Sequence, residues 1–363
     1  MSFSLFEGIM NRVVIHIVLA GLVLCTGAFV SCSKERSVQK TRVSFIVKTE
    51  SDMTKAALTE TQESRVASLD LLVFRSADGM LDCHVRTEAS GSGSVSMLDA
   101  SVTSGIEVDW FIVANIPADR IASVDNKGSF LSKLTSISDM SAGTMVMYAF
   151  GSQVFDPGTN LIENVGLIRY ACKVTVDNIL VSWLGTFEHT PTCTLDEIAL
   201  VNVRGTCPLS GVPTADAADL WYNKSSVGNY GGFLQACLDW TGSMAIAGPQ
   251  SYDVGVSLFA MPNASEGEGM GPVTLVNPWT PRRTRIALKL TIDGASQWYP
   301  VDLPAMSGKT HYVVSNVTIM GPGTEGPDEG IDRTSVSFTV NVYQWGEENH
   351  GEQHFPLEDD SNG

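Results

Sequence analysis

Residues 335–345 read SVSFTVNVYQW, an alternation of apolar and polar residues that is typical of a β-strand with one buried face. The apolar residues recur at every second position: Val336, Phe338, Val340 and Val342. A stretch rich in glycine, proline and acidic residues, GPGTEGPDEGID (321–332), precedes this strand. Because a single strand is not stable alone, it must join a sheet of its own molecule or of another one.

Short apolar segments of the same kind cover most of the chain, which predicts an all-β fold. The segment 66–85 predicts a hairpin, because two apolar arms flank Asp78-Gly79, a dipeptide favoured in tight turns. Short strands with frequent turn residues predict β-sandwiches, and the length of the chain predicts two of them. Further strands are expected at 42–49, 108–117, 144–151, 165–179, 194–203, 252–261, 283–294, 297–304 and 311–321.

Helical structure is expected in only two places. Residues after Pro117 have helical spacing and predict a helix that carries Phe130, Leu131, Leu134 and Ile137 on one face. The stretch 205–250 predicts loops with a short helix.

Composition limits the classes of function. The chain has 363 residues, of which 44% are hydrophobic and 17% charged, so it can bury a core. Its formal net charge of −17 argues against nucleic acid and against adsorption to an anionic bilayer, since both need a basic surface.

The N-terminal segment predicts export. Residues 10–32 place Arg12 before an apolar run and then small residues that lead to Cys32. The sequence FVSC (29–32) resembles the cleavage box of a bacterial lipoprotein. Residues 1–31 are therefore predicted to be a lipoprotein signal peptide, with Cys32 bearing lipid such as palmitate. A plain secretory signal with an incidental cysteine is the alternative.

The remaining cysteines do not form a disulfide framework. They are odd in number and widely spaced. Cys172 lies in an apolar strand and is predicted to be a small core residue. One bridge among the other four stays open: Cys83, Cys193, Cys207 and Cys237.

Motifs of catalysis and of cofactor binding are absent from the sequence, so no catalytic, cofactor-binding or metal-binding residue is predicted. HGEQH (350–354) has the spacing of two metal-binding histidines but lies in an acidic tail. EGPDEGID (325–332) is predicted to be a solvated linker, not a calcium site. One aromatic group is predicted to pack loops onto a sandwich, with a sugar platform as the alternative: Trp221, Tyr222, Tyr230 and Trp240.

The first and last strands share a pattern. Residues 43–47 read VSFIV and residues 336–340 read VSFTV. Two strands that present the same side chains to the core can fill the same groove. Coincidence is the alternative, because V-x-F-x-V is common in sandwiches.

The chain resembles the fimbrillin family of Bacteroidales, the lipoprotein-precursor pilins of type V fimbriae. The resemblance covers nearly the whole chain after the signal peptide. It is carried by five segments in the family's order: RVSFIVKTESDMTKA (42–56), FIVAN (111–115), VGLIRYACKV (165–174), HYVVSNVTIMGPGTEGPDE (311–329) and TVNVYQW (339–345).

The resemblance implies two transthyretin-like β-sandwich domains, at 56–168 and 169–321, with C-terminal donor strands. It implies that a protease removes residues 32–55 with the first strand, displacing Val43, Phe45 and Val47. A donor strand of the next subunit, within 322–363, would then fill the groove. The members' arginine at the cut is replaced here by Lys55, before Ala56, and Arg65 is the alternative site.

We therefore expect a structural subunit of a cell-surface fimbria, or pilus. It would be exported to the outer membrane as a lipoprotein, polymerise by donor-strand exchange and contribute to adhesion, without enzymatic activity. The expected partners are other copies of itself, related fimbrial subunits, a processing protease and a host or bacterial surface ligand. The membrane is contacted only through the precursor's lipid. The alternatives are an anchor or tip adhesin of the same fimbria, or a non-polymerising outer-membrane glycan-binding lipoprotein.

Overall fold

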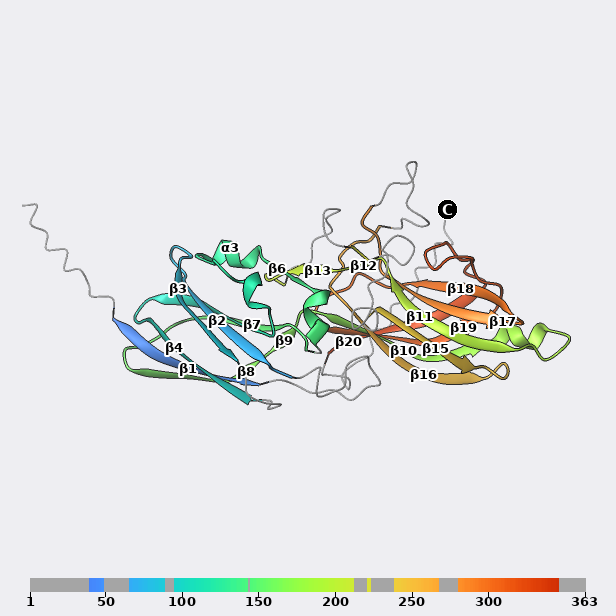
Figure 1. The fold of residues 1–363 in the computed structure, drawn as a ribbon, viewed down its shortest axis with the longest axis horizontal. Helices are drawn as coiled ribbons and strands as arrows, with labels where there is room; N and C mark the ends of the chain where they lie inside the picture. Colours follow the sequence, from blue (N-terminus) through green and yellow to red (C-terminus); the bar gives the residue numbers. More distant parts are fainter. Residues whose placement is uncertain are drawn as a thin grey trace, which may run out of the picture. The chain divides into compact units, whose positions relative to one another are not determined.

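The fold was determined as a computed structural model. It describes residues 39–48, 65–88, 95–142, 144–211, 221–222, 238–267 and 280–345. The chain divides into the units Met1–Lys40 and Thr41–Gly363. Apart from Lys40, the first residue of strand β1, every element below lies in the second unit. Its strands form two sets of sheets, as predicted for a largely β protein (Figure 1).

The first set, called the N-terminal sandwich here, consists of two sheets. One has the order β4 (Val95–Thr103), β1 (Lys40–Lys48), β8 (Thr159–Gly166). The other has the order β3 (Leu81–Glu88), β2 (Ser68–Arg75), β5 (Glu107–Ala114), β7 (Met147–Val154), β9 (Ile168–Arg169). Phe45 of β1 joins the two sheets, because its ring meets Trp110 of β5 edge to face at 5.2 Å.

Local sequence explains the start of this sandwich. Strands β2 and β3 form the predicted hairpin, and Gly79 in its turn has φ +69°, a conformation that favours glycine. Strand β5 is central, between β2 and β7, as its apolar sequence predicts. Asn115 follows β5 and connects its end to two other segments of the same molecule. Its side chain accepts a hydrogen bond from the Ala67 N–H at 2.7 Å and donates one to the Met145 carbonyl at 2.7 Å.

The second set, the C-terminal sandwich, also has two sheets. One has the order β16 (Ser251–Ala260), β10 (Cys172–Val181), β19 (Thr310–Ile319), β20 (Val336–Gln344). The other has the order β15 (Asp239–Ala245), β11 (Cys193–Val201), β17 (Arg285–Ile292), β18 (Ala295–Asp302). The predicted strands of this half are confirmed in place and in order.

Two short strand pairs supplement the sandwiches. Strand β6 (Leu134–Ser136) pairs with β13 (Thr206–Pro208), and β12 (Val203–Arg204) pairs with β14 (Trp221–Tyr222). The hydroxyl of Tyr170 donates to the Leu209 carbonyl at 2.8 Å. Segments that lie on either side of Tyr170 in sequence are thus joined by backbone and side-chain hydrogen bonds.

The helix predicted around Phe130 is wrong in extent. Helix α3 (Lys127–Leu131) ends after five residues, and Leu134 belongs to β6 with 41% of its surface exposed. Phe130 and Ile137 are buried, so helical spacing arose from two core residues on either side of a short strand. The other helical elements that are defined among the described residues are short and of 3₁₀ type: η1 (Ala118–Arg120), η2 (Ile137–Ala142) and η3 (Ser182–Thr186).

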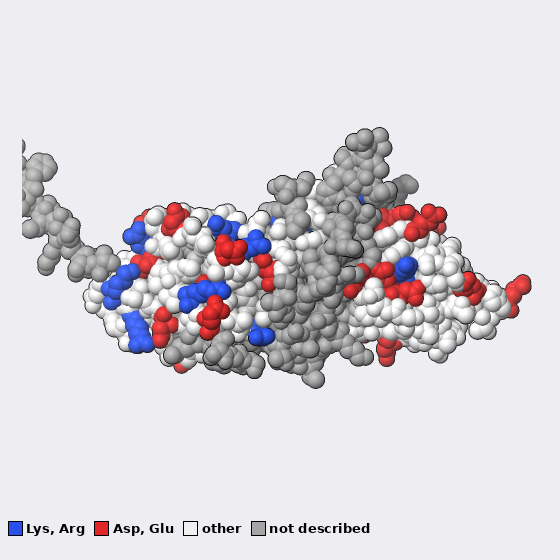
Figure 2. All heavy atoms as spheres, viewed as in Figure 1, with Lys and Arg blue, Asp and Glu red and all other residues white. Residues whose placement is uncertain are grey.

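The stretch 205–250, predicted to be loops with a short helix, forms strands among its described residues, while 212–220 and 223–237 lie outside the described ranges. It contains β13, β14 and β15, and β15 extends the sheet of β11 as its edge strand. In the described part of the chain, no helix is long and apolar enough to cross a membrane. On the face shown in Figure 2, basic groups lie mostly over the N-terminal sandwich and are interrupted by acidic and neutral ones. That face does not offer the continuous basic surface that nucleic acid requires.

Candidate functional site

Strand β1 is built into the core of the N-terminal sandwich. Val43, Phe45 and Val47 are all at most 1% exposed. The ring of Phe45 contacts Trp110 at 5.2 Å and Phe155 at 6.3 Å, both edge to face. The strand lies between β4 and β8 and runs parallel to β8. Removal of β1 would therefore open a groove with an apolar floor and an unpaired sheet edge on either side.

Polar groups hold β1 as well. On its outer face, Ser44 donates a hydrogen bond to Asp99 of β4, and Arg42 forms an ion pair with the same carboxylate at 2.7 Å. The hydrogen bond from Ser44 and then the Arg42 guanidinium lower the pKa of Asp99. At the start of the strand, the buried hydroxyl of Thr41 donates to the Asp156 carbonyl at 2.9 Å. These contacts fix the position of β1 along its neighbours.

Strand β20 is held less completely. It forms the edge of its sheet and pairs antiparallel with β19. Val336 and Val340 are buried, whereas Phe338 and Val342 are only half-buried against the core. In the intact chain, β20 thus packs on its own molecule.

Trp345 follows β20 and anchors its end. The side chain is 1% exposed and stacks on Phe259 at 5.8 Å. The guanidinium of Arg169 lies 4.7 Å from the indole ring and the ammonium of Lys173 lies 5.6 Å from it, which are cation–π distances. In the sequence, Trp345 stands out only as the end of the last predicted strand. A lone tryptophan after an alternating strand is the signal that could have indicated its role.

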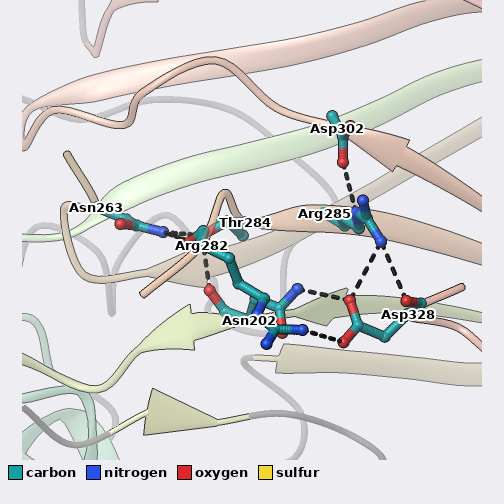
Figure 3. A network of polar contacts seen from close by, with 7 residues as sticks. All are labelled: Asn202, Asn263, Arg282, Thr284, Arg285, Asp302 and Asp328. Atoms are coloured by element: carbon teal, nitrogen blue, oxygen red, sulfur yellow. Dashed lines mark hydrogen bonds and ion pairs between the residues drawn. The ribbon is translucent and has the colours of Figure 1, made fainter. Parts of the chain in front are cut away.

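The connection between β19 and β20 is docked, so the prediction of a solvated linker at 325–332 is wrong. Asp328 is 3% exposed and lies between two buried arginines, as Figure 3 shows. Its carboxylate is 3.4 Å from Arg282 and 3.3 Å from Arg285, and it accepts from Asn202 at 2.7 Å. A buried carboxylate needs such partners, and these are 43 or more positions away in sequence.

The conformation of the connection on either side of Asp328 is also defined. Thr324 exchanges backbone hydrogen bonds with Trp298 at 2.8 and 2.9 Å. Beyond Asp328, the Thr334 N–H donates to the Asp332 carboxylate at 2.9 Å, in an exposed turn that leads into β20. Asp328 is therefore the most deeply buried polar side chain of the connection, Ile331 packs partly against the core, and an exposed turn at 332–334 leads into β20.

The residues predicted for export and processing fall outside the described part of the chain: Cys32, Lys55 and Ala56. Arg65, the alternative processing site, is described. Its side chain is exposed, but its carbonyl accepts a hydrogen bond from the Asn115 side chain at 2.7 Å. The backbone at Arg65 is thus tied to the end of β5.

The cysteines and aromatic residues are placed as follows. Cys172 is buried in the core, as predicted, and Cys193 is a buried free thiol whose pKa is raised to about 11 by burial and by Asp196. Trp221 and Tyr222 are buried in β14, which agrees with packing and not with a sugar platform. Tyr230, Cys237 and the HGEQH segment lie outside the described ranges.

Comparison with known proteins agrees with this arrangement. Residues 41–170 match the family model described as major fimbrial subunit protein (FimA). No curated protein sequence matches the chain. A crystal structure of a fimbrilin from Porphyromonas gingivalis is similar, with a TM-score of 0.61 and 15% identity over 85% of this chain and 98% of that chain.

Two structures assigned to cell adhesion are also similar. One, from Parabacteroides distasonis, has a TM-score of 0.59 and 16% identity and covers 84% of this chain and 97% of that chain. The other, from Bacteroides eggerthii, has a TM-score of 0.57 and 18% identity over 84% and 96%. Residues 41–170 thus match the family model of the major fimbrial subunit protein, and the fold of the chain is similar to that of a fimbrilin.

Proposed function

We propose that this chain is a structural subunit of a cell-surface fimbria and polymerises by donor-strand exchange. In this reaction β1 leaves the N-terminal sandwich of one copy and β20 of another copy takes its place. One observation carries the proposal. The two strands share V-S-F-x-V, yet Phe45 is fully buried in β1 while Phe338 is only half-buried at the edge of its own sheet. Strand β20 would bury more of its apolar face in the groove of another copy than it buries at the edge of its own sheet.

The magnitudes agree with a reaction that needs a trigger. Burial of Val43, Phe45 and Val47 contributes roughly 5–9 kcal/mol in gross terms, at about 1.5–3 kcal/mol for each side chain. Strand β20 would regain a similar amount in the groove, together with the hydrogen bonds of an added strand. While β1 is tethered, however, its effective concentration is on the millimolar scale, so it outcompetes a strand from another molecule.

Cleavage between β1 and β2 would remove that advantage. Lys55 and Ala56 remain the proposed processing site, in the sequence between the two strands. The hydrogen bond from Asn115 to the Arg65 carbonyl supports this choice, because proteases need an extended and freely accessible backbone. We further propose that the precursor reaches the outer membrane as a lipoprotein acylated at Cys32. Adhesion to a surface ligand would be a property of the assembled fimbria.

A strand that can be donated favours a subunit of the stalk over an anchor or tip adhesin. The buried state of Trp221 and Tyr222 supports a structural role over glycan binding. The partners that follow from this role are other copies of the chain and related fimbrial subunits.

The proposal is tested with Phe338→Asp in the full chain. The purified protein is nicked by a limited amount of trypsin, and polymers are detected as a ladder on SDS gels without boiling. We expect wild type to form the ladder and Phe338→Asp to form none, because the substitution would place an unpaired carboxylate in the apolar groove. Before cleavage its thermal midpoint should fall only by a few degrees, since Phe338 is half-buried.

Gln344→Asp is the matched control, because it adds the same charge at the exposed end of β20. This variant should polymerise like wild type. A ladder of normal yield from Phe338→Asp would overturn donor-strand exchange. Failure of the uncleaved Phe338→Asp protein to fold would show that β20 belongs to the core of its own molecule.

A further inference from the structure

The match between the two terminal strands is longer than V-S-F-x-V. Residues 40–47 read KTRVSFIV and residues 333–340 read RTSVSFTV. When Phe45 is aligned with Phe338, Thr41 is aligned with Thr334 and Ser44 with Ser337. The structure shows what these additional matches mean, because Thr41 and Ser44 both make hydrogen bonds that position β1.

In this alignment, the two segments have identical residues at every position that is buried in β1. The four buried positions of β1 are Thr41, Val43, Phe45 and Val47, and all four have the same residue in 334–340. The three positions that differ face outward: Lys40 and Arg42 are exposed and Ile46 is half-buried. A coincidental apolar alternation would not also retain a buried threonine.

Where β20 now lies, both matched polar residues, Ser337 and Thr334, are exposed, and the Thr334 hydroxyl bonds within its own turn, to Asp332 at 2.9 Å. In β1, by contrast, Ser44 donates to the Asp99 carboxylate, and Thr41 donates to the Asp156 carbonyl and accepts from Asn160 at 3.2 Å. The acceptors belong to β4 and to the residues around the start of β8, which stay in place when β1 is lost.

We propose that the groove left by β1 selects β20 of a second copy of this chain in a single register, in which Thr334 and Ser337 take over the hydrogen bonds of Thr41 and Ser44. Asp99 and the segment 156–160 are then specificity-determining groups, and the favoured partner is the chain itself. This inference rests on the proposed strand exchange. The incoming strand runs parallel to β8, as β1 does. The ion pair of Arg42 with Asp99 is not reproduced in this register, because Ser335 stands at the position of Arg42.

The fit of the strand can be tested without polymerisation. Three substitutions in the full chain, Lys40→Arg, Arg42→Ser and Ile46→Thr, convert residues 40–47 into the sequence of 333–340. We expect this graft to lower the thermal midpoint by only a few degrees. In the control, residues 335–342 replace 40–47, which keeps the apolar alternation but moves it by two residues. The control should lose about 10 °C or more, because phenylalanine and valine exchange pockets and a valine replaces the hydrogen-bonded Thr41, whereas position 44 keeps a hydroxyl as threonine.

The polar selection is tested on assembled polymers by a double-mutant cycle with Ser337→Ala and Asp99→Ala. The dissociation rate of subunits is measured in the wild type, in both single variants and in the double variant. Ser337→Ala should raise this rate roughly tenfold when Asp99 is present, since a hydrogen bond to a charged acceptor is lost. In the Asp99→Ala background it should change the rate less than about twofold.

The outcomes separate the two proposals. Polymers in which the two substitutions act independently would leave strand exchange intact and overturn the selection by Asp99. An in-register graft that destabilises the chain as much as the shifted control would overturn the inference whether or not polymers form. Absence of polymers from wild type, with a stable in-register graft, would overturn the proposed function and the selection between copies, and would leave only the fit of the sequence 333–340 in the groove.

Discussion

At the scale of single residues, Asp328 shows how a polar side chain can fix a connection that looks unstructured in sequence. Glycine, proline and acidic residues around it are typical of a solvated loop. The structure instead buries its carboxylate between Arg282 and Arg285. Because each buried charge needs its partner, the three residues stabilise the C-terminal sandwich as a unit (Figure 3).

Asp328→Asn should lower the free energy of unfolding by about 3 kcal/mol, because it removes the carboxylate shared by the buried Arg282 and Arg285. Arg285 still keeps its ion pair with Asp302. Urea denaturation at neutral pH measures the loss. Glu325→Gln is the control, since Glu325 is exposed in the same connection and its substitution should change stability by less than about 0.5 kcal/mol. Equal effects of the two substitutions would mean that the buried ion pairs do not hold the connection.

At the scale of elements, local sequence patterns predicted most strands correctly. They failed where pairing with a distant strand decides the structure. Asp78-Gly79 and the alternation at 42–49 are short-range patterns, and both gave the observed hairpin and strand. The helix around Phe130 is too long, and the described part of 205–250 forms strands, because pairing with other strands decides both. Strand β6 pairs with β13, about 70 residues away in sequence, and that pairing overrides helical spacing.

The candidate site likewise has some features that the sequence predicts and others that it does not. The similarity of β1 and β20 could be read from V-S-F-x-V, because periodicity alone assigns the residues to one face. The hydrogen bonds of Ser44 with Asp99 and the packing of Trp345 on Phe259 could not, because each depends on residues brought together by the tertiary fold.

The packing of Trp345 leads to a prediction about how firmly β20 is held. Its indole anchors the end of β20 to its own molecule, whereas the proposed register carries it beyond the end of β1 in the groove. Trp345→Ala should therefore destabilise the intact chain by about 3–5 kcal/mol and shorten the time to polymer formation after cleavage. Thermal unfolding and timed samples on unboiled gels measure both effects.

Tyr343→Ala is the control, because Tyr343 is half-buried in the same strand. It should have a smaller effect on both measurements. A Trp345→Ala variant that is destabilised but polymerises more slowly than wild type would show that the tryptophan is needed in the polymer, and would contradict its role as an anchor of the unexchanged strand.

At the scale of the whole molecule, the proposed exchange assigns different roles to β1 and β20: β1 would be removed and β20 would be transferred. The N-terminal sandwich contains β1 as one of its inner strands, and the C-terminal sandwich carries β20 at an edge. Asp328 docks the connection before β20, and the residues after it lead through an exposed turn. Such a chain can donate one strand and keep both sandwiches folded.

A disulfide between two copies tests this account most directly. One population carries Asp99→Cys and the other Ser337→Cys; the two are mixed, nicked by trypsin and oxidised gently. The account predicts a covalent dimer that contains one chain of each kind, formed only after cleavage, because the two introduced thiols then occupy the positions of a hydrogen-bonded pair in β4 and β1. Asp177→Cys, at an exposed position of β10, replaces Asp99→Cys in the control and should give no such dimer. Polymers that form normally but yield no more of the first dimer than of the control would contradict the transfer of β20 into the groove of β1.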